Sequence, residues 1–237
     1  MIKKFSPFTA CFFTFATLIV PPAHAAGWPT DFTAQYTIDA GFVSAGKASK
    51  QLRKLDNGHY EYHSKSSTTG MMAFLVKDKT DERSELVLHQ NQPRPIKHVH
   101  VREGRKAKTA TQKYNWKINE VESSVKGTIH RFTLPADAID QGAYQLALMM
   151  RLANGERNFT LNVAEHKRME QYPIRHIDSK KLKTALGKFE TIVIHSKYKK
   201  QSTTLWCAPE LDYLPVRIEH REGGVTYTAN LVQLQKR

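Results

Sequence analysis

Short runs in which apolar and polar residues alternate recur along most of this sequence. A period of two residues places every second side chain on the same face of a β-strand, so each run predicts a strand with one buried face. The clearest runs span residues 32–38, 60–64, 159–163 and 216–231, and weaker ones span 96–101 and 113–118. Turn-forming pairs such as Asn57-Gly58 and Gly223-Gly224 separate them, and Leu186-Gly187-Lys188 predicts a further hairpin tip leading into an apolar strand at 189–194.

One segment departs from this period. Residues 141–152 repeat apolar positions every three or four residues, Asp137 and Asp140 precede them as N-cap candidates, and Asn154-Gly155 follows as a stop signal. We therefore expect one central helix near residues 138–153. Many short strands around one helix favour a mainly β protein with an antiparallel, strongly curved sheet, a barrel or half-barrel, because a flat sandwich leaves the helix no place.

The N-terminus has the order of a secretory signal peptide. Lys3 and Lys4 precede an uncharged apolar stretch that ends at Pro21-Pro22, and small residues follow around Ala25. The apolar stretch is shorter than the roughly 20 residues that span a bilayer. Too little apolar sequence precedes Cys11 for a lipidated cysteine. We therefore predict a signal peptide over residues 1–25, no transmembrane segment in the mature chain, and a single β-rich periplasmic domain over 26–237, in which we find no linker or repeat.

The charge balance limits the partners. Lys and Arg number 36 against 22 Asp and Glu, a formal charge of +14, so an anionic partner is favoured. Basic clusters lie at 102–113, 180–183 and 197–200. In an exported protein these clusters favour anionic lipid head groups or acidic glycans over nucleic acid, and a merely solubilising charged surface is an equally good interpretation.

Two motifs near residue 44 imitate nucleotide and acyl-enzyme sites. Gly41 to Lys47 nearly matches a phosphate-binding loop, but Ala48 stands where a hydroxyl would hold magnesium, and no helix pattern begins there. Ser44 and Lys47 match a Ser-x-x-Lys motif, but residues three apart in a strand point to opposite faces. We reject both and interpret Gly41 and Gly46 as turn glycines of one hairpin.

Histidine and cysteine offer two further candidates. His98-Val99-His100 places two imidazoles on one strand face, a spacing that zinc uses, with His63 or His130 as a third ligand. The alternative is that Val99 and Val101 face the core and the histidines face solvent, which we prefer, so we predict no metal and no cofactor. Cys207 follows an apolar run and is expected to be buried rather than nucleophilic.

The C-terminal third resembles a known family. The segments 182–191 and 205–219, a hairpin with a glycine tip followed by a Trp strand and a Leu-Pro-Val-Arg strand, resemble exported Gram-negative bacterial proteins catalogued as domain of unknown function 3108. The spacing of Tyr36, Gly41 and Gly46 and the Gln92-Pro93-Arg94-Pro95 entry are also similar. The resemblance implies a periplasmic β-rich fold, similar in shape to half-barrel lipoprotein carriers and related lipid-handling proteins, and it supplies no catalytic residues.

These observations predict a periplasmic binding module for a lipid-like or envelope-glycan ligand, more readily than an enzyme. A structural or assembly factor that binds another cell-envelope protein, through an exposed strand edge, is the alternative. No catalytic residue is predicted. The residues expected to line a ligand cavity, if one exists, are Phe32, Tyr36, Tyr62, Tyr144 and Leu148, and ordinary core packing explains the same residues.

Overall fold

The computed structural model describes residues 29–236 except 71, 72, 74–76 and 105. The signal peptide predicted over residues 1–25 lies outside this part of the chain. In the described part, no helix is both long and apolar enough to cross a membrane.

A single fifteen-strand sheet contains nearly all of the regular structure. Its order is β8-β7-β6-β5-β4-β3-β2-β1-β15-β14-β13-β12-β11-β10-β9, and every pairing is antiparallel except that of β9 with β10. The elements are β1 (Phe32–Ala40), β2 (Val43–Lys54), β3 (Tyr60–Thr68), β4 (Lys79–His89), β5 (Gln92–Glu103), β6 (Lys108–Asn115), β7 (Glu120–Val125), β8 (Thr128–Thr133), β9 (Ile139–Asp140), α2 (Tyr144–Ala153), β10 (Asn158–Ala164), β11 (Met169–Thr184), β12 (Gly187–Tyr198), β13 (Gln201–Ala208), the 3-10 turn η1 (Pro209–Leu211), β14 (Leu214–Glu222) and β15 (Val225–Lys236).

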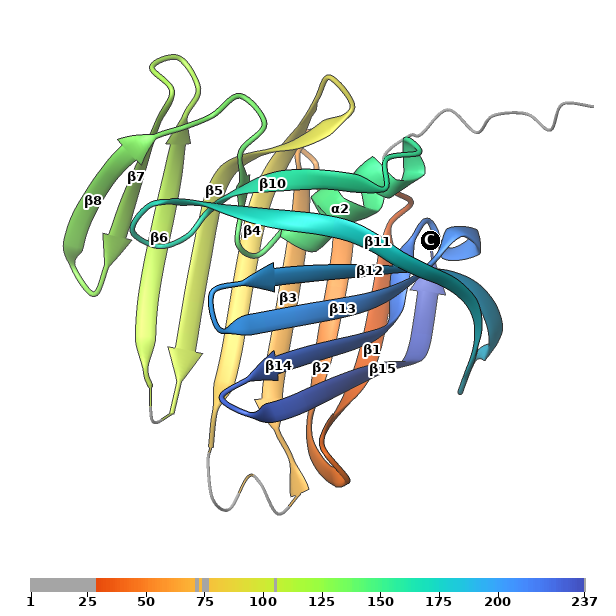
Figure 1. The fold of residues 1–237 in the computed structure, drawn as a ribbon. Helices are drawn as coiled ribbons and strands as arrows, with labels where there is room; N and C mark the ends of the chain where they lie inside the picture. Colours follow the sequence, from red (N-terminus) through yellow and green to blue (C-terminus); the bar gives the residue numbers. More distant parts are fainter. Residues whose placement is uncertain (1–28, 71–72, 74–76, 105, 237) are drawn as a thin grey trace, which may run out of the picture.

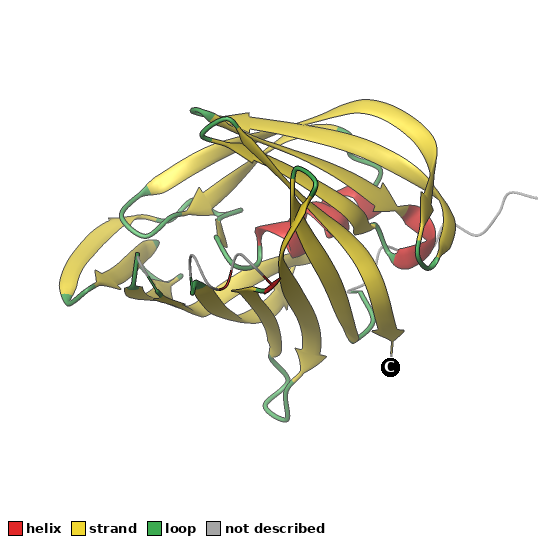
Figure 2. Ribbon diagram, turned by 90° about the horizontal axis from the view of Figure 1, so that it is seen from below, coloured by secondary structure: helices red, strands yellow, loops and turns green. Residues whose placement is uncertain are grey.

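Two halves of this sheet face each other. The first meander, β1 to β8, and the second, β10 to β15, are joined where β1 pairs with β15. Figures 1 and 2 show the halves as two layers with α2 between them. The sheet is not closed, since β8 and β9 end the strand order and do not pair with each other. The predicted mainly β, antiparallel fold with one helix is confirmed for the described residues.

The core lies between the layers around α2. Phe32, Ala34 and Tyr36 of β1 are buried, as the alternation predicted, and Ile38, the last residue of that run, is half-buried. Leu146, Leu148 and Leu152 of α2 are fully buried in the same cluster. We call the sheet face that packs on this core the inner face and the opposite one the outer face.

The helix begins later than predicted. Residues 138–143 are not helical: Ile139 and Asp140 form β9, and the N-cap is Ala143, without a side-chain cap. Asp140 instead accepts a hydrogen bond from the Ala143 backbone N–H at 2.8 Å. The end is as predicted, with Asn154 as C-cap and Gly155 at φ +87°.

Most predicted strands and turns are present, with two corrections. The strand expected at 113–118 ends at Asn115, because residues 116–119 form the turn to β7. Gly41 forms the β1–β2 turn with φ +60°, but Gly46 lies inside β2, where an added Cβ would lie 2.5 Å from the Ser67 carbonyl oxygen. Gly46 therefore permits a close strand approach rather than a turn.

Candidate functional site

A row of polar side chains crosses the inner face of the first half-sheet. Ser84, His98, Gln112 and Ser123 are direct cross-strand partners on β4, β5, β6 and β7. All four are fully buried. A buried polar group is costly unless it is hydrogen-bonded, so this row, which we call the polar row, needs partners.

The opposite half of the molecule supplies those partners. The Ser84 hydroxyl donates to Asp140 Oδ1 at 2.6 Å. The Gln112 side-chain amide donates to the Glu165 carbonyl oxygen at 2.9 Å and lies 3.4 Å from that of Ala164. The Ser123 hydroxyl donates to the His166 carbonyl oxygen. The polar row thus holds β9 and the β10–β11 turn against the first half-sheet, on the side where no described strands pair.

These bonds fix the proton position on His98. Because the Gln112 nitrogen faces carbonyl oxygens, its Oε1 faces His98 Nδ1 at 3.0 Å and accepts from it. The Tyr114 hydroxyl donates to the same Oε1 at 3.0 Å. His98 Nε2 points the other way and lies 4.0 Å from Glu82 Oε1.

Asp140 and Gly142 complete this arrangement. Burial raises the pKa of Asp140, although the electrostatic interaction with His98 and the hydrogen bond from Ser84 work against that rise. An added Cβ on Gly142 would lie 2.8 Å from Ser84 Oγ and 3.0 Å from His98 Nε2. Only glycine therefore allows the chain before α2 to approach this closely.

The arrangement does not make Ser84 a nucleophile. Its hydroxyl donates to Asp140 rather than to His98, and both Ser84 and His98 are fully buried. A substrate would need access to the hydroxyl and a base positioned to take its proton. The polar row joins the two halves of the molecule.

A second, charged row lies beside the polar row and is partly accessible. Lys50, Ser64, Glu82, His100 and Ala110 are cross-strand partners on β2 to β6. On β4, β5 and β6 this row lies two residues from the polar row. The Glu82 and His100 side chains are 19% and 12% exposed, and His100 Nδ1 lies 2.7 Å from Glu82 Oε1. The His100 ring packs edge-on against that of His166, with centroids 4.9 Å apart.

Glu82 is the electrostatic centre of this region, since its charge acts on Lys50, Lys108 and His166. We call Lys50, Glu82, His100, Lys108 and His166 the Glu82 cluster. Burial alone would raise the pKa of Glu82, but the hydrogen bond from His100 and the neighbouring cationic side chains hold that pKa below its ordinary value. Glu82 is therefore a carboxylate at neutral pH.

The basic members of the cluster respond to the same surroundings. Burial lowers the pKa of Lys50 to about 8, although Glu82 opposes this. Burial, together with Lys108 and His100, lowers the pKa of His166 to about 3, so this imidazole is neutral in any physiological medium. Burial also lowers the pKa of Lys108.

The five predicted ligand-lining residues come together in the core. Phe32, Tyr36, Tyr62 and Leu148 are buried, and Tyr144 is partly buried against the same cluster. Phe32 and Tyr62 pack edge-on with centroids 6.4 Å apart. Besides burial, which is the larger cause, the charge of Glu82 raises the pKa of both Tyr62 and Tyr144. Two predicted residues therefore border the Glu82 cluster.

The preferred interpretation of His98 and His100 is wrong. Both histidines face inward, while Val99 and Val101 lie on the outer face opposite Arg83 and Asp81. The inward side is polar here, so the alternation of apolar residues pointed to the wrong face. No group of three or more side chains suited to holding a metal ion occurs among the described residues. His63, a suggested third ligand, lies on the outer face and bonds Asp81 at 2.8 Å.

Cys207 is buried and free, as expected. Burial raises the pKa of its thiol, so the reactive thiolate is disfavoured.

Sequence reasoning did not single out Lys50, Glu82, Gln112 or His166. It interpreted Asp140 as a helix cap and included Lys108 only as part of a basic cluster. Strand parity carried the signal. Ser84 and Glu82 lie two and four residues before Leu86, and Lys50 lies two residues before Leu52. Those apolar neighbours fix the inward face, and the polar residues share it.

The chain is similar in fold to a solved structure, and its sequence matches a known family model. A β-barrel-like protein of domain of unknown function DUF1849 from Brucella abortus superposes with a TM-score of 0.61 at 10% identity, covering 88% of this chain and 98% of that one. At this identity the likeness concerns the fold alone. No protein of curated function matches the sequence. The family described as "Protein of unknown function (DUF3108)" matches residues 35–230, and the chain belongs to that family.

Proposed function

We propose that this protein is a non-enzymatic periplasmic binding module for an amphiphile with an anionic head group, held on the inner face between the two layers. One observation carries the proposal: along β2 and β4 the inner face changes from buried apolar residues, Leu52 and Leu86, to the partly accessible Lys50 and Glu82. An amphiphile needs this pairing of an apolar surface and a few placed polar groups. A lipid-like ligand fits this lining better than a glycan.

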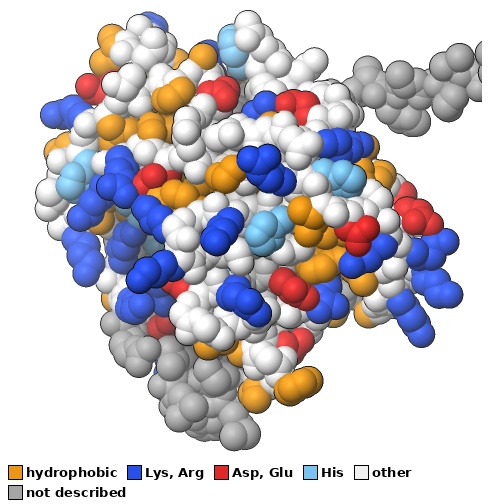
Figure 3. Space-filling view, in the orientation of Figure 1, with side chains coloured by type: hydrophobic (Ala, Val, Ile, Leu, Met, Phe, Trp, Pro, Cys, Tyr) orange, Lys and Arg blue, Asp and Glu red, His pale blue; other side chains and the backbone are white. Residues whose placement is uncertain are grey.

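The head group is expected to be anionic because cations outnumber carboxylates at the accessible end. Lys108 lies close enough to Arg102 and Lys167 for their charges to lower its pKa further, and to Glu82 and Glu165 for theirs to raise it. Arg102 is already paired with Asp78 at 2.6 Å. Figure 3 shows Lys and Arg side chains gathered on the left of the molecule, over the β4–β6 side.

The apolar part of the ligand would contact the tyrosines that border the Glu82 cluster. The Tyr62 hydroxyl is buried and has no hydrogen-bond partner among the described residues. Tyr144 packs edge-on against Tyr172, whose ring lies 4.9 Å from that of Tyr198. Tyrosines present an apolar body with a polar tip, which suits the boundary between an acyl chain and a head group.

Native mass spectrometry and calorimetry test this function. Protein isolated from the periplasm is expected to retain a lipid mass, and the stripped protein to bind lysophosphatidylglycerol more tightly than lysophosphatidylcholine. Lys50→Met should weaken lysophosphatidylglycerol binding at least fivefold, because it removes a half-buried cation. Lys97→Met, on the exposed outer face of β5, is the matched control. Equal binding of the two lipids, or equal effects of the two variants, would refute the proposal.

The predicted export is tested on the same sample. Cleavage after Ala25 gives a product that begins at Ala26, which an intact mass establishes. A product that begins at Met1 would remove the reason for choosing an envelope lipid as ligand.

A second function, binding of another envelope protein, is favoured by β8. This strand pairs only with β7 among the described strands, and Ile129 on it is 53% exposed. Such an edge can add a strand from a partner. A co-purifying protein that is lost in Ile129→Lys, with no retained lipid in either sample, would support assembly over lipid binding.

A further inference from the structure

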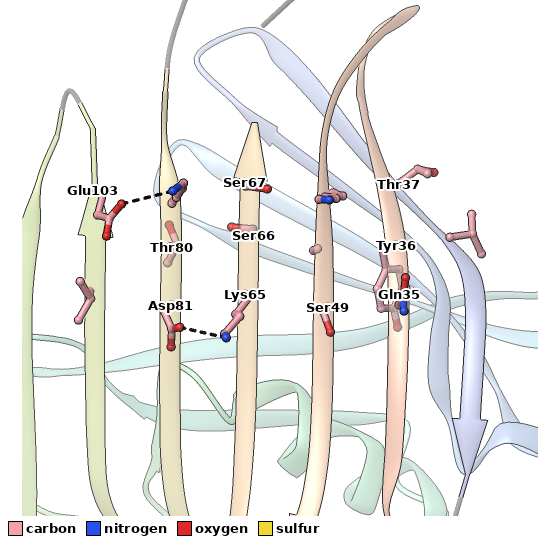
Figure 4. Close-up of a pocket in the computed structure, with 15 residues that line it drawn as sticks. Gln35, Tyr36, Thr37, Ser49, Lys65, Ser66, Ser67, Thr80, Asp81 and Glu103 are labelled. Atoms are coloured by element: carbon pink, nitrogen blue, oxygen red, sulfur yellow. Dashed lines mark ion pairs between the residues drawn. The ribbon is translucent and has the colours of Figure 1, made fainter. Parts of the chain in front are cut away.

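We propose a second binding site, on the outer face of β1 to β5, for a small saccharide that carries a phosphate or carboxylate group. A hollow of about 630 Å³ lies there, lined mainly by small polar side chains and by charged ones. Figure 4 shows the residues that line it, which lie on neighbouring strands of the first half-sheet. It is on the opposite side of the sheet from the Glu82 cluster and does not depend on the proposed lipid function.

The hollow is built from two cross-strand rows. Thr37, Lys47, Ser67, Lys79 and Glu103 form one row, and Gln35, Ser49, Lys65, Asp81 and Val101 form the other. Both rows lie on the outer face, because the residues between them in sequence, such as Tyr36, belong to the inner face. The small side chains of Thr37, Ser49 and Ser67 in these rows leave space that larger side chains would fill.

Three lysines line the hollow around Ser67. Lys47 and Lys79 are the two cross-strand partners of Ser67, so their Cα atoms are about 10 Å apart. Lys65 lies two residues from Ser67 on the same strand. A phosphate or carboxylate above the Ser67 hydroxyl would therefore be within reach of three flexible cations.

These lysines are available for a ligand. Within the described residues Lys47 has no ion pair, and Lys65 and Lys79 have only exposed, long ones, at 3.7 Å to Asp81 and 3.9 Å to Glu103. Exposed pairs of this kind are worth at most about 1 kcal/mol, so a ligand anion can replace them. Asp81 keeps other partners, His63 and Arg83.

The rest of the lining favours a saccharide over a nucleic acid. The hydroxyls of Thr37 and Ser49 and the Gln35 amide supply donors and acceptors for sugar hydroxyls. Base stacking needs an exposed aromatic side chain. The aromatic residue in the described lining, Tyr36, is buried, and its hydroxyl donates to the Pro215 carbonyl oxygen on the inner side. The volume suits a ligand of one or two sugar rings.

Calorimetry with glucose 6-phosphate, glucuronate, glucose and inorganic phosphate tests the proposal. We expect one of the first two probes to bind at least tenfold more tightly than either glucose or inorganic phosphate. The triple variant Lys47→Met, Lys65→Met, Lys79→Met should lose at least tenfold in affinity for that probe. The matched control, Lys97→Met, Lys113→Met, Lys117→Met, removes three exposed lysines that do not line the hollow, from β5, β6 and the β6–β7 turn, and should change affinity by less than twofold.

Amide chemical shifts in the unmodified protein give a second measurement that does not depend on how the variants fold. The bound probe should shift the Ser49 and Ser67 amides, and saturating lysophosphatidylglycerol should not displace it. The site is refuted if neither anionic saccharide binds, or if the two lysine variants lose affinity equally. Inorganic phosphate as tight as the saccharides would refute the saccharide class. Displacement by the lysolipid would place the probe in the interior and so refute the outer site.

Discussion

The two halves of this molecule meet along two sides that are built by different means. On one side β1 pairs with β15 over all nine residues of β1, through backbone hydrogen bonds. On the other side no described strands pair, and the side chains of the polar row bond Asp140 and the carbonyl oxygens of the β10–β11 turn. Backbone pairing tolerates most side chains, whereas the polar row depends on a few particular ones.

The first test of this difference between the two sides removes the Gln112 side chain. In Gln112→Ala the Glu165 carbonyl oxygen, the His98 Nδ1–H and the Tyr114 hydroxyl lose their common partner inside the protein. Each unsatisfied buried group costs about 1–3 kcal/mol, so we expect a loss of about 3 kcal/mol in the free energy of unfolding, measured with urea.

Gln35→Ala is the matched control on the other side. Gln35 is exposed on β1 opposite Gln233, and its backbone pairing survives the change. We expect a loss below about 0.5 kcal/mol. Similar losses in the two variants would mean that the polar row does not hold the halves together.

The second test overfills the polar row. In Gly142→Ala the new methyl group would meet Ser84 Oγ at 2.8 Å and His98 Nε2 at 3.0 Å. The segment before α2 would have to move away to avoid this clash. Overpacking of this kind lowers the free energy of unfolding by about 2 kcal/mol. Gly155→Ala would meet no atom within 4 Å but sits at φ +87°, so it separates backbone strain from crowding. Urea titration of both variants gives the comparison, and an unaffected Gly142→Ala would show that the contact is loose.

The sequence predicted the backbone-paired side well and missed the polar row. The alternation in 32–38 and 216–231 identified β1, β14 and β15 because an apolar inward face is visible as a period of two. His98 and Gln112 also face inward, but period-two reasoning assigns polar residues to solvent. Their burial becomes apparent only when the cross-strand register places Ser84, His98, Gln112 and Ser123 in one row. Asp140 resembles a helix cap in the sequence because its strand is two residues long and pairs in parallel with a strand that comes later in the chain.

A third test uses pH to ask whether the charge on Asp140 weakens the polar row. Burial raises the pKa of this carboxyl in the folded protein, so the folded state binds the proton more tightly than the unfolded state does. Stability is then highest below the unfolded pKa and falls as the pH rises through the folded pKa, by about 1.4 kcal/mol for each pH unit that separates the folded pKa from the unfolded one. His98, Ser84, Glu82, Tyr114 and the Ala143 N–H are the groups that face Asp140.

Asp140→Asn removes this dependence while keeping an oxygen that can accept from Ser84 and Ala143. We expect the stability of the variant, relative to the unmodified protein, to increase as the pH rises from about 4, near the ordinary pKa of an aspartate, and then to level off. Asp137→Asn, at an exposed carboxyl bonded to Asn162, should give a flat difference. A difference that declines with rising pH would mean that the ionised Asp140 strengthens the join.

The smallest effect is expected next to the backbone-paired side, in Tyr36→Phe. The change removes one hydrogen bond, from the Tyr36 hydroxyl to the Pro215 carbonyl oxygen at 2.9 Å, and leaves the ring and the β1–β15 pairing in place. We expect a loss of about 1 kcal/mol by urea titration, with lysophosphatidylglycerol binding unchanged, because the ring packs in the core. Weaker lipid binding at unchanged stability would instead place Tyr36 against the ligand, as the sequence predicted. The apolar zone of the inner face would then belong to the binding site rather than only to the core.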